Sequence, residues 1–382
     1  MTKILYIGAA HFIGGAERVL LNFLSHVHPA TINARVIIFG KTGAMSDALA
    51  KQQVKSLCVQ HINFFTGSVW FRVPIIPFQY LWRLVKIFRY AIKYKPDIIH
   101  AWCLPAIDVS ALLSILLRRP ALATLHMSLT VRHVPEIRRL SIKISSAKIT
   151  SFICVSEATK RAAIDGGVAE QKSITIHNGL PEPAPAFQKS TPLNEISKDR
   201  RKIRLSCIGV IQERKGQHVL LQAVHRLKKN GINNWELKIV GDVFRGIGTD
   251  YKKNLLAYVN SHNLSASVIF KGWSRDINSV YAHTDILVLP SIDFDPFPTV
   301  LLEATQIGIP AIAGTIGGIP EIIIDGDNGW LFPPGNVDAL SHILADALEG
   351  KLTLSRNTPF RFTLDRQVKE TLAIYSKLRG KH

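Results

Sequence analysis

Two acidic residues, Asp295 and Glu303, lie eight positions apart after a predicted buried strand at residues 286–289. A short polar loop follows that strand and leads to Pro298, which is well placed as the first residue of a helix. Gly308 supplies the stop signal for this helix. The spacing therefore predicts one carboxylate just before a helix start and another between one and two turns into the helix.

A helix start between two carboxylates suits a ligand that carries both phosphate and hydroxyl groups. The first N–H groups of the helix, near Thr299 and Val300, have no partner within the helix, and the helix dipole favours an anion there. Helical side chains lean toward the N-terminus, so Glu303 points back toward this pocket, and Asp295 is expected on its rim. A carboxylate beside a phosphate accepts hydrogen bonds from sugar hydroxyls, as in dinucleotide-binding folds. We therefore expect a nucleotide sugar, with a donor site that includes Phe297, Pro298, Thr299, Val300 and Glu303. The alternative is that Asp295 caps a turn and Glu303 is a solvated helix residue.

The residues that follow extend this pattern. Asp295-x7-Glu303 is followed by Ala304, Gly308-Ile309-Pro310 and Gly317-Gly318-Ile319-Pro320-Glu321. This arrangement resembles the donor-binding core of the family 4 retaining glycosyltransferases. The resemblance implies an α/β chain with the GT-B fold, in which two Rossmann-like parallel-sheet domains face each other across a cleft. It also implies that Glu303 contacts the nucleotide and that Asp295 contacts the sugar, although the family usually has glutamate at the first position.

A second group of charges follows the strand predicted at residues 204–209. A cation on a loop at this point is suited to a diphosphate and would stabilise charge on the leaving nucleoside diphosphate. Lys215-Gly216 matches the pattern of the family, whereas Val210 stands where the family has arginine, and Arg214 is a candidate to supply that charge. The alternative for Lys215 is an ordinary solvated loop residue.

Three further segments of the chain complete the candidate site. Gly14 and Gly15 follow a predicted strand at residues 3–8 and precede an amphipathic helix, so they either admit a phosphate or sugar or only form a tight turn. His126 directly follows a strand predicted at residues 121–125, where open α/β sheets place ligand groups, although a lone histidine is often structural. The resemblance implies that Gly14-Gly15 line the cleft and that His126 contacts the donor sugar or the acceptor. It also aligns Gly272-Trp273 with the loop that holds the base, where Trp273 either stacks on the base or packs in the core.

The resemblance implies a retaining transfer in which the donor phosphate helps to deprotonate the acceptor hydroxyl. His126, Lys215 and Asp295 are the expected catalytic residues. No cofactor and no metal ion are expected, and the sequence contains neither Asp-x-Asp nor a metal-ligand spacing of histidine and cysteine.

Length and composition predict a folded chain of two domains. The chain has 382 residues, of which 47% are hydrophobic and 20% charged. The strand–helix alternation is interrupted by a proline-rich, polar stretch. We predict an acceptor-binding domain at residues 1–180, a linker at 181–202 and a donor-binding domain at 203–358, with a C-terminal helix at about 360–382 that packs back on the first domain.

The net charge of +19 is concentrated in the first half of the chain. Residues 1–185 hold 22 Lys and Arg against 9 Asp and Glu. Within residues 70–95, a helical pattern places Leu81, Leu84, Val85, Phe88, Ala91 and Ile92 on one face and Arg83, Lys86, Arg89 and Lys93 on the other, with Trp82 and Tyr90. Cations mixed with interfacial aromatic residues favour a helix that lies on an anionic membrane. The alternative is a helix that packs on the sheet and has a solvated basic face.

These features lead to three hypotheses. The first is a cytoplasmic glycosyltransferase that is peripheral at the inner face of the cytoplasmic membrane. It would use a UDP- or GDP-sugar as donor and a lipid-linked or cell-envelope glycan as acceptor. Its product would serve lipopolysaccharide, capsule or exopolysaccharide assembly. No run of apolar residues is long enough for a transmembrane helix, and four scattered cysteines suggest a reducing compartment. The second is a nucleotide-sugar epimerase of the same fold. The third is a basic nucleic-acid-binding protein, for which the sequence offers charge but no recognition motif, so nucleic acid is not an expected partner.

Overall fold

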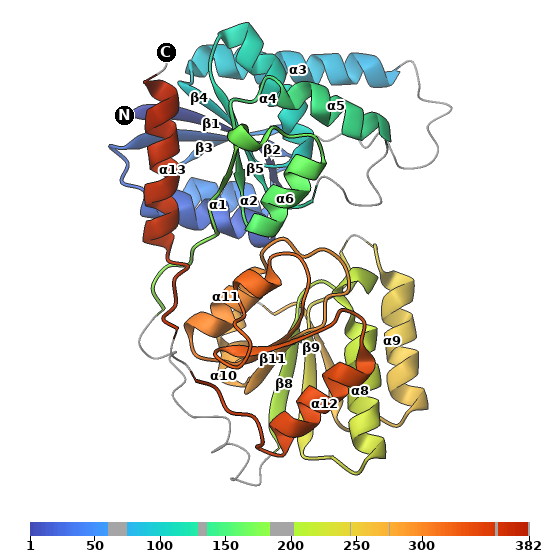
Figure 1. Cartoon of the computed structure of the whole chain (residues 1–382). Coiled ribbons are helices and arrows are strands. Elements are labelled where there is room, and N and C mark those ends of the chain that lie inside the picture. The colour runs from blue at the N-terminus through green and yellow to red at the C-terminus, as the bar shows by residue number, and fades with distance from the viewer. Residues whose placement is uncertain are drawn as a thin grey trace. The chain divides into compact units, whose positions relative to one another are not determined.

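The computed structural model describes residues 1–59, 75–128, 136–183, 202–244, 246–274, 276–355 and 358–380. The chain divides into two compact units, which we call unit 1 (Met1–Pro181 with Phe362–His382) and unit 2 (Glu182–Arg361). Each unit is built on its own parallel sheet, so the predicted α/β class with two parallel-sheet domains is confirmed (Figure 1). The predicted linker at 181–202 lies almost entirely outside the described residues.

Unit 1 contains a seven-stranded parallel sheet of order β3-β2-β1-β4-β5-β6-β7. Its strands are β1 (Thr2–Ala10), β2 (Ile32–Phe39), β3 (Lys55–Val59), β4 (Ile98–Ala101), β5 (Ala121–Leu125), β6 (Ser151–Cys154) and β7 (Ser173–Thr175). Its helices are α1 (Gly15–His26), α2 (Ala44–Lys51), α3 (Ile75–Tyr94), α4 (Leu104–Leu117), α5 (Glu136–Ser146), α6 (Glu157–Asp165) and α13 (Leu364–Arg379), with a short 3-10 turn η2 (Glu170–Lys172). The central strands read as apolar runs because helices bury both faces of this sheet.

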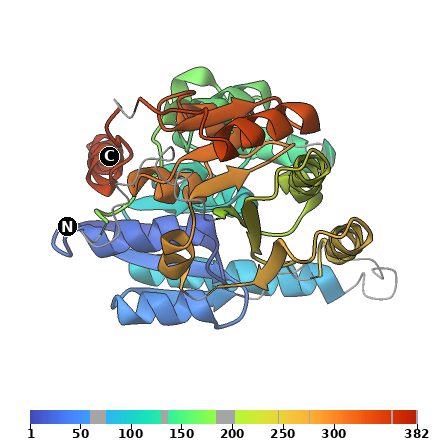
Figure 2. The same ribbon diagram turned by 90° about the horizontal axis from the view of Figure 1, so that it is seen from below.

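Two separate cores show which helices cover which face. One core joins side chains of α1, α2 and α13 to Ile4 and Tyr6 of β1. The other joins side chains of α3, α4, α5 and α6 to Leu5 and Ile7 of the same strand. Successive strand residues point to opposite faces, so β1 contributes alternately to both cores. The C-terminal helix α13 lies beside α1 (Figures 1 and 2).

A buried polar network fixes α13 to the sheet. The hydroxyl group of Tyr375 lies 2.7 Å from that of Tyr6 and 2.8 Å from Nδ1 of His100. Nε2 of His100 lies 2.7 Å from Oγ1 of Thr124. Burial lowers the pKa of His100 to about 3, and the neighbouring His126 adds to this shift, so the imidazole is neutral at physiological pH.

Unit 2 contains a six-stranded parallel sheet of order β10-β9-β8-β11-β12-β13. Its strands are β8 (Ile203–Ile208), β9 (Trp235–Val240), β10 (Val268–Gly272), β11 (Ile286–Leu289), β12 (Ala311–Gly314) and β13 (Gly329–Phe332). Its helices are α8 (Gln217–Lys229), α9 (Thr249–Ser261), α10 (Ile277–Ala282), α11 (Thr299–Gln306) and α12 (Val337–Leu348), with 3-10 turns η4 (Glu213–Lys215) and η5 (Ile319–Glu321). One core joins α8, α9 and α12 to the sheet, while α11 packs on β11 and β12 with Leu301, Leu302 and Ala304 buried.

The alternative in which α3 packs on the sheet with its whole apolar face is wrong in part. Leu81, Val85 and Ile92, which would pack inward in that alternative, are 59%, 45% and 45% exposed. The helix instead buries Ile87, Ala91 and Tyr94. The reason lies in its aromatic rings: the hydroxyl of Tyr94 donates to the carbonyl oxygen of Asn33 at 2.5 Å, and the Arg35 guanidinium lies over the Tyr94 ring, 4.4 Å from its centroid.

This rotation also changes the environment of the basic residues of α3. Arg83 is half-buried, and burial lowers the pKa of its guanidinium, whereas Arg89 and Lys93 are exposed. Within the described parts of the chain, no helix combines the length and the hydropathy required to cross a bilayer.

Candidate active site

The candidate site in unit 2 lies at the switch point of its sheet. The chain runs outward from β8 through β9 and β10 on one side, and β11, β12 and β13 extend the sheet on the other side of β8. The connections that leave the parallel neighbours β8 and β11 therefore run to opposite sides at the carboxyl ends of these strands, where open α/β sheets form a ligand crevice. The loops that follow these two strands carry Lys215 and Asp295, respectively.

Lys215 and Asp295 contact each other across this switch point. Nζ of Lys215 lies 2.5 Å from Oδ2 of Asp295, with side-chain exposures of 14% and 6%. The hydroxyl of Ser291 donates to the same carboxylate oxygen at 3.1 Å. Lys215 is therefore not the solvated loop residue of the alternative interpretation. The side chain of Asp295, which was predicted on the rim of the pocket, is buried and is held by Lys215 and Ser291.

Two glycines allow the loops at this point to approach closely. Gly216 has φ +68°, and a Cβ atom there would lie 1.9 Å from the carbonyl oxygen of Pro290 in the loop after β11. Gly317 has φ +59°, and its Cβ would lie 2.1 Å from the carbonyl oxygen of Asp295. A side chain at either position would push apart the backbone segments that hold Lys215 against Asp295.

The helix that follows Asp295 presents an uncapped N-terminus. Pro298 is the N-cap residue and Thr299 the first helical residue, one position later than predicted. The first helical hydrogen bond is donated by Leu301 N to Pro298 O at 3.1 Å. No side chain in the described chain caps this helix, and its first turn has no acidic residue. Phe297 and Pro298 are buried, whereas Thr299 and Val300 are half-buried, so the first turn retains its preference for an anion.

Glu303 is held by a tyrosine that the sequence did not indicate. The hydroxyl of Tyr281 donates to Oε2 of Glu303 at 2.6 Å. Tyr281 lies on α10 and is 3% exposed, and Glu303 is half-buried. The alternative of a solvated helix residue is therefore wrong for Glu303. A short hydrogen bond to an ionised group is among the stronger ones, so Tyr281 fixes the direction of this carboxylate.

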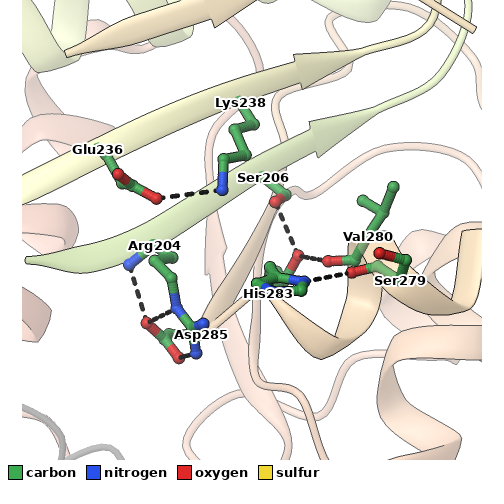
Figure 3. A network of polar contacts seen from close by, with 9 residues as sticks. Arg204, Ser206, Glu236, Lys238, Ser279, Val280, His283 and Asp285 are labelled. Atoms are coloured by element: carbon green, nitrogen blue, oxygen red, sulfur yellow. Dashed lines mark hydrogen bonds and ion pairs between the residues drawn. The ribbon is translucent and has the colours of Figure 1, made fainter. Parts of the chain in front are cut away.

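The position of α10, and with it Tyr281, is set by the network in Figure 3. The hydroxyl groups of Ser206 on β8 and Thr284 lie 2.7 Å apart, and Thr284 donates to the carbonyl oxygen of Val280 at 2.7 Å. Arg204 forms a bidentate ion pair with Asp285, with distances of 3.0 Å from Nε to Oδ2 and 2.8 Å from Nη2 to Oδ1. These contacts fasten the C-terminal end of α10 to β8 and to the start of β11.

The other predicted donor residues of unit 2 lie on neighbouring loops. Gly272 ends β10, and its N-terminal neighbours pair in parallel with β9. Trp273 is 58% exposed, so the core-packing alternative is wrong for this residue. Arg214 is exposed, and its Nε donates to Oε1 of Gln212 at 3.1 Å. The structure does not place the Arg214 guanidinium in contact with the Lys215–Asp295 pair.

Unit 1 has a switch point of its own, between β1 and β4. Gly14 and Gly15 follow β1, and Trp102 follows β4. The indole Nε1 of Trp102 donates to the carbonyl oxygen of Ala16 at 3.2 Å, and its ring lies 4.7 Å from the ring of His126 between centroids. The structure thus brings the predicted Gly14, Gly15 and His126 together at the carboxyl ends of β1, β4 and β5, with Trp102 between them.

Glu17 organises the glycine loop of unit 1. Its Oε1 accepts a hydrogen bond from Ala10 N at 3.0 Å, and its Oε2 accepts one from Gly14 N at 3.2 Å. The side chain is buried, with 8% exposure. Glu17 therefore closes the loop between β1 and α1 through one half of a capping box, the bond from the N-cap N–H to the side chain of the third helical residue, and its spacing from Gly14 is the sequence signal for this bond.

His126 has the environment of a neutral hydrogen-bonding group. Burial lowers its pKa to about 3. Its Nε2 atom is inaccessible to solvent and has no hydrogen-bond partner among the described residues. A neutral imidazole with an unused nitrogen can bind a hydroxyl group, but it cannot act as a cationic acid near neutral pH.

Sequence reasoning missed Tyr281, Ser291 and Trp102, and it did not identify the role of Glu17. Only Glu17 has a local signal, its spacing from Gly14. Tyr281 lies 22 positions before Glu303 and reaches it through the packing of α10, for which the sequence has no comparable pattern. Among the described residues, no group of three or more His, Cys, Asp and Glu side chains is arranged to hold a metal ion.

Comparison with known proteins assigns the chain to a family. The model of the glycosyl transferases group 1 matches residues 191–359, and the model of glycosyltransferase family 4 matches residues 13–182. Together, the two matches include the candidate residues of both units.

Individual relatives agree with the family models. The chain is 29% identical over 168 residues to the putative colanic acid biosynthesis glycosyltransferase WcaL of Salmonella typhimurium, and the alignment covers 40% of this chain and 40% of that protein. It is 26% identical over 217 residues to the UDP-Gal:alpha-D-GlcNAc-diphosphoundecaprenol alpha-1,3-galactosyltransferase of Escherichia coli, which covers 55% of this chain and 54% of that protein. The aligned parts thus span only about half or less of these relatives.

A solved structure matches nearly the whole chain. Anabaena Alr3699/HepE in complex with UDP and glucose superposes with a TM-score of 0.79 and 23% identity, over 98% of this chain and 100% of that chain. This likeness establishes the fold, and the predicted GT-B fold is confirmed. With two parallel-sheet units, candidate residues at both switch points and a family model matched to each unit, the chain belongs to the glycosyltransferase family of group 1 and family 4 enzymes.

Proposed function

We propose that this glycosyltransferase is a retaining enzyme that transfers a hexose from a UDP- or GDP-sugar to a lipid-linked or cell-envelope glycan. The observation that carries the proposal is the contact between Lys215 and Asp295 across the switch point of unit 2, beside the uncapped start of α11. A cation and a helix N-terminus at one crevice favour a diphosphate, and Glu303 lies on the same helix.

In this proposal the donor binds through three kinds of contact. The diphosphate accepts hydrogen bonds from the N–H groups of Thr299 and Val300 and from the Lys215 ammonium. The ribose hydroxyls donate to the Glu303 carboxylate, which Tyr281 holds in place. The exposed indole ring of Trp273 stacks on the base. Asp295 balances the charge of Lys215 before the donor arrives and keeps the ammonium directed at the crevice.

The transfer exchanges one bond to the anomeric carbon for another. The bond from that carbon to the diphosphate oxygen breaks, and the bond to the acceptor oxygen forms on the same face of the sugar. The acceptor hydroxyl gives its proton to the departing diphosphate. Lys215 and the first turn of α11 stabilise the negative charge that grows on the leaving group. No protein nucleophile, metal ion or organic cofactor takes part in this scheme.

Unit 1 supplies the acceptor side in this proposal. His126 is neutral, so in this proposal it meets the sugar or the acceptor as a hydrogen-bonding group and does not protonate it. The glycine loop at Gly14-Gly15, closed by Glu17, leaves backbone N–H groups near the start of α1. The names of the relatives support a glycan acceptor, because one refers to colanic acid biosynthesis and another to a diphosphoundecaprenol-linked sugar.

The proposal is tested with the purified full chain and a panel of nucleotide sugars. A thermal-shift screen finds the donor, because a ligand that binds only the folded state raises the unfolding temperature. The matching UDP- or GDP-sugar is then incubated with a diphosphoundecaprenol-linked sugar, and NMR determines the anomeric configuration of the product. Retention of configuration supports the proposal, whereas inversion contradicts the retaining mechanism.

Two controls separate the remaining alternatives. If the donor sugar changes its configuration without any acceptor, the protein is an epimerase and not a transferase. If a chelator abolishes transfer and added divalent cations restore it, the metal-free scheme is wrong. Lys215→Met serves as the inactive reference, because it removes the ammonium and keeps the length of the side chain.

A further inference from the structure

The exposed apolar side chains of this protein are concentrated on three neighbouring helices of unit 1. Half of the large apolar residues that are exposed in the described chain lie on α3, α4 and α5. These helices are adjacent, since α4 packs against both α3 and α5 (Figure 1). We call the exposed side chains of these helices the α3–α5 surface; its main members are Trp82, Val85, Ile92, Ile115, Leu116 and Ile144.

Helix α4 is apolar on its outer side as well as on its inner side. Its sequence, LPAIDVSALLSILL, contains no Lys, Arg or Glu. Ala111 and Leu113 are buried, yet Leu112, Ile115 and Leu116 are 43%, 53% and 53% exposed. A helix that is hydrophobic all round is normally covered on every side, and the described residues leave this side of α4 uncovered.

Helices α3 and α5 extend the same apolar surface on both sides of α4. On α5, Leu140 and Ile144 are one turn apart and are 57% and 65% exposed. On α3, the exposed Trp82 has the Lys86 ammonium over its ring, 5.7 Å from the centroid. The two helices therefore add large apolar side chains, including one tryptophan that has a cation next to it.

The charges around this surface have a single sign. Residues 75–148 contain twelve Lys and Arg but only three Asp and Glu. Arg89, Lys93, Arg118, Arg119 and Lys143 are exposed. The acidic side chains that the structure describes here are engaged: Asp97 accepts from Lys3 N at 2.8 Å, and Asp108 accepts from the Ser145 hydroxyl at 2.7 Å. The surface is thus apolar at its centre and cationic around it.

We propose that the α3–α5 surface docks on an anionic lipid bilayer and lies in its headgroup region. Exposed apolar residues that reach the acyl boundary, with cations at headgroup level, are what such an interface requires. Each Lys or Arg near an anionic membrane contributes about 1 kcal/mol, equivalent to about fivefold in binding. The sequence pointed to α3 alone, with Arg83, Lys86, Arg89 and Lys93 as its cations. The structure adds α4 and α5, and it leaves Arg89 and Lys93 exposed while Arg83 is half-buried.

Other occupants fit this surface less well. A second copy joined by a two-fold axis would place the cationic rim of one protomer against that of the other, since both contribute the same patch. A nucleic acid would meet the cations but would leave the apolar side chains against a polar, hydrated backbone. Only a lipid surface provides both an apolar phase and a negative layer.

The test is flotation of the full-length protein with vesicles of phosphatidylcholine, with and without phosphatidylglycerol. The first variant, Leu116→Ser with Ile144→Ser, changes exposed apolar residues. The second variant, Arg89→Glu with Lys93→Glu, reverses exposed charges. The matched control, Leu256→Ser with Lys253→Glu, makes the same kinds of change at exposed positions on α9 in unit 2.

We expect the wild type and the control to float with the anionic vesicles and not with pure phosphatidylcholine. Each test variant should need at least about tenfold more lipid for half-maximal binding. The charge variant loses two cations of about fivefold each. The serine variant loses two large apolar side chains that would be buried at the acyl boundary. The thermal unfolding temperature should be unchanged in all variants, which shows that they are folded and keeps the result independent of the proposed activity. The proposal would be overturned if both test variants floated like the wild type. It would also be overturned if the wild type formed a dimer that dissociates in the variants and bound no lipid, or if it bound duplex DNA in preference to vesicles.

Discussion

Tyr281→Phe tests whether binding of the nucleotide, which we propose to contact Glu303, depends on the tyrosine that holds Glu303 in place. The substitution removes only the hydroxyl group that donates to Glu303 Oε2 at 2.6 Å. A hydrogen bond to a charged group contributes about 1.5–3 kcal/mol. Glu303 is half-buried, so water can replace part of this bond. We therefore expect UDP to bind about tenfold more weakly, which corresponds to about 1.4 kcal/mol.

The assay is isothermal titration of UDP into the wild type, Tyr281→Phe, Glu303→Gln and the double variant. Glu303→Gln should lose more affinity than Tyr281→Phe, because it removes the anionic acceptor itself. If Tyr281 acts through Glu303, the double variant should bind UDP no more weakly than Glu303→Gln alone. Tyr258→Phe is the matched control, since the Tyr258 hydroxyl also has a side-chain partner in unit 2, Nδ1 of His225 at 3.0 Å, but not on α11.

Two results would refute this reasoning. If the losses of the two single variants add in the double variant, the two residues act independently. If Tyr281→Phe binds UDP like the wild type while Glu303→Gln does not, the tyrosine has no positioning role. Thermal unfolding of each variant, measured in parallel, shows whether a weak binder is still folded.

The remaining predictions concern stability. Asp295→Asn leaves the Lys215 ammonium largely buried without a counter-charge, so the free energy of unfolding in urea should fall by about 3 kcal/mol. An unchanged midpoint of unfolding would contradict a stabilising ion pair. Glu17→Gln replaces one of two carboxylate oxygens that accept from Ala10 N and Gly14 N, so it should cost about 1 kcal/mol in thermal unfolding, and a variant as stable as the wild type would contradict the capping role. His100 has a pKa of about 3 when folded and an ordinary pKa when unfolded, so only the unfolded chain gains its proton between about pH 6.5 and 3. The stability that neutral His100 contributes is therefore complete above pH 6.5 and declines as the pH falls, by up to about 1.4 kcal/mol per pH unit, and His100→Asn should show a shallower decline in urea titrations at several pH values.

The central strands of both sheets could be predicted because they are apolar runs that end at glycine or a polar loop. β5 and β11 were predicted with the observed bounds. The strands that were missed, β3 and β13, lie at sheet edges. β3 starts at Lys55 and is partly exposed, and β13 begins with glycine after a polar turn, so neither has the continuous apolar run of a strand that is buried on both faces.

The candidate site could be predicted where it depends on local order along the chain. The helix start at Thr299 and the residues Lys215 and Asp295 follow strands directly, and the carboxyl ends of parallel strands lie together. The sequence does not show in which direction each side chain points. The burial of Asp295, the hold of Tyr281 on Glu303 and the exposed outer side of α4 all depend on packing between elements that are distant in the chain.

The most direct test of the donor site is an experimental structure of the protein with bound UDP. We predict that a diphosphate oxygen lies within about 3.2 Å of Lys215 Nζ and of an N–H group in the first turn of α11, with a ribose hydroxyl at the same distance from the Glu303 carboxylate. A nucleotide bound away from the switch point of unit 2, in contact with neither Lys215 nor Glu303, would contradict this prediction.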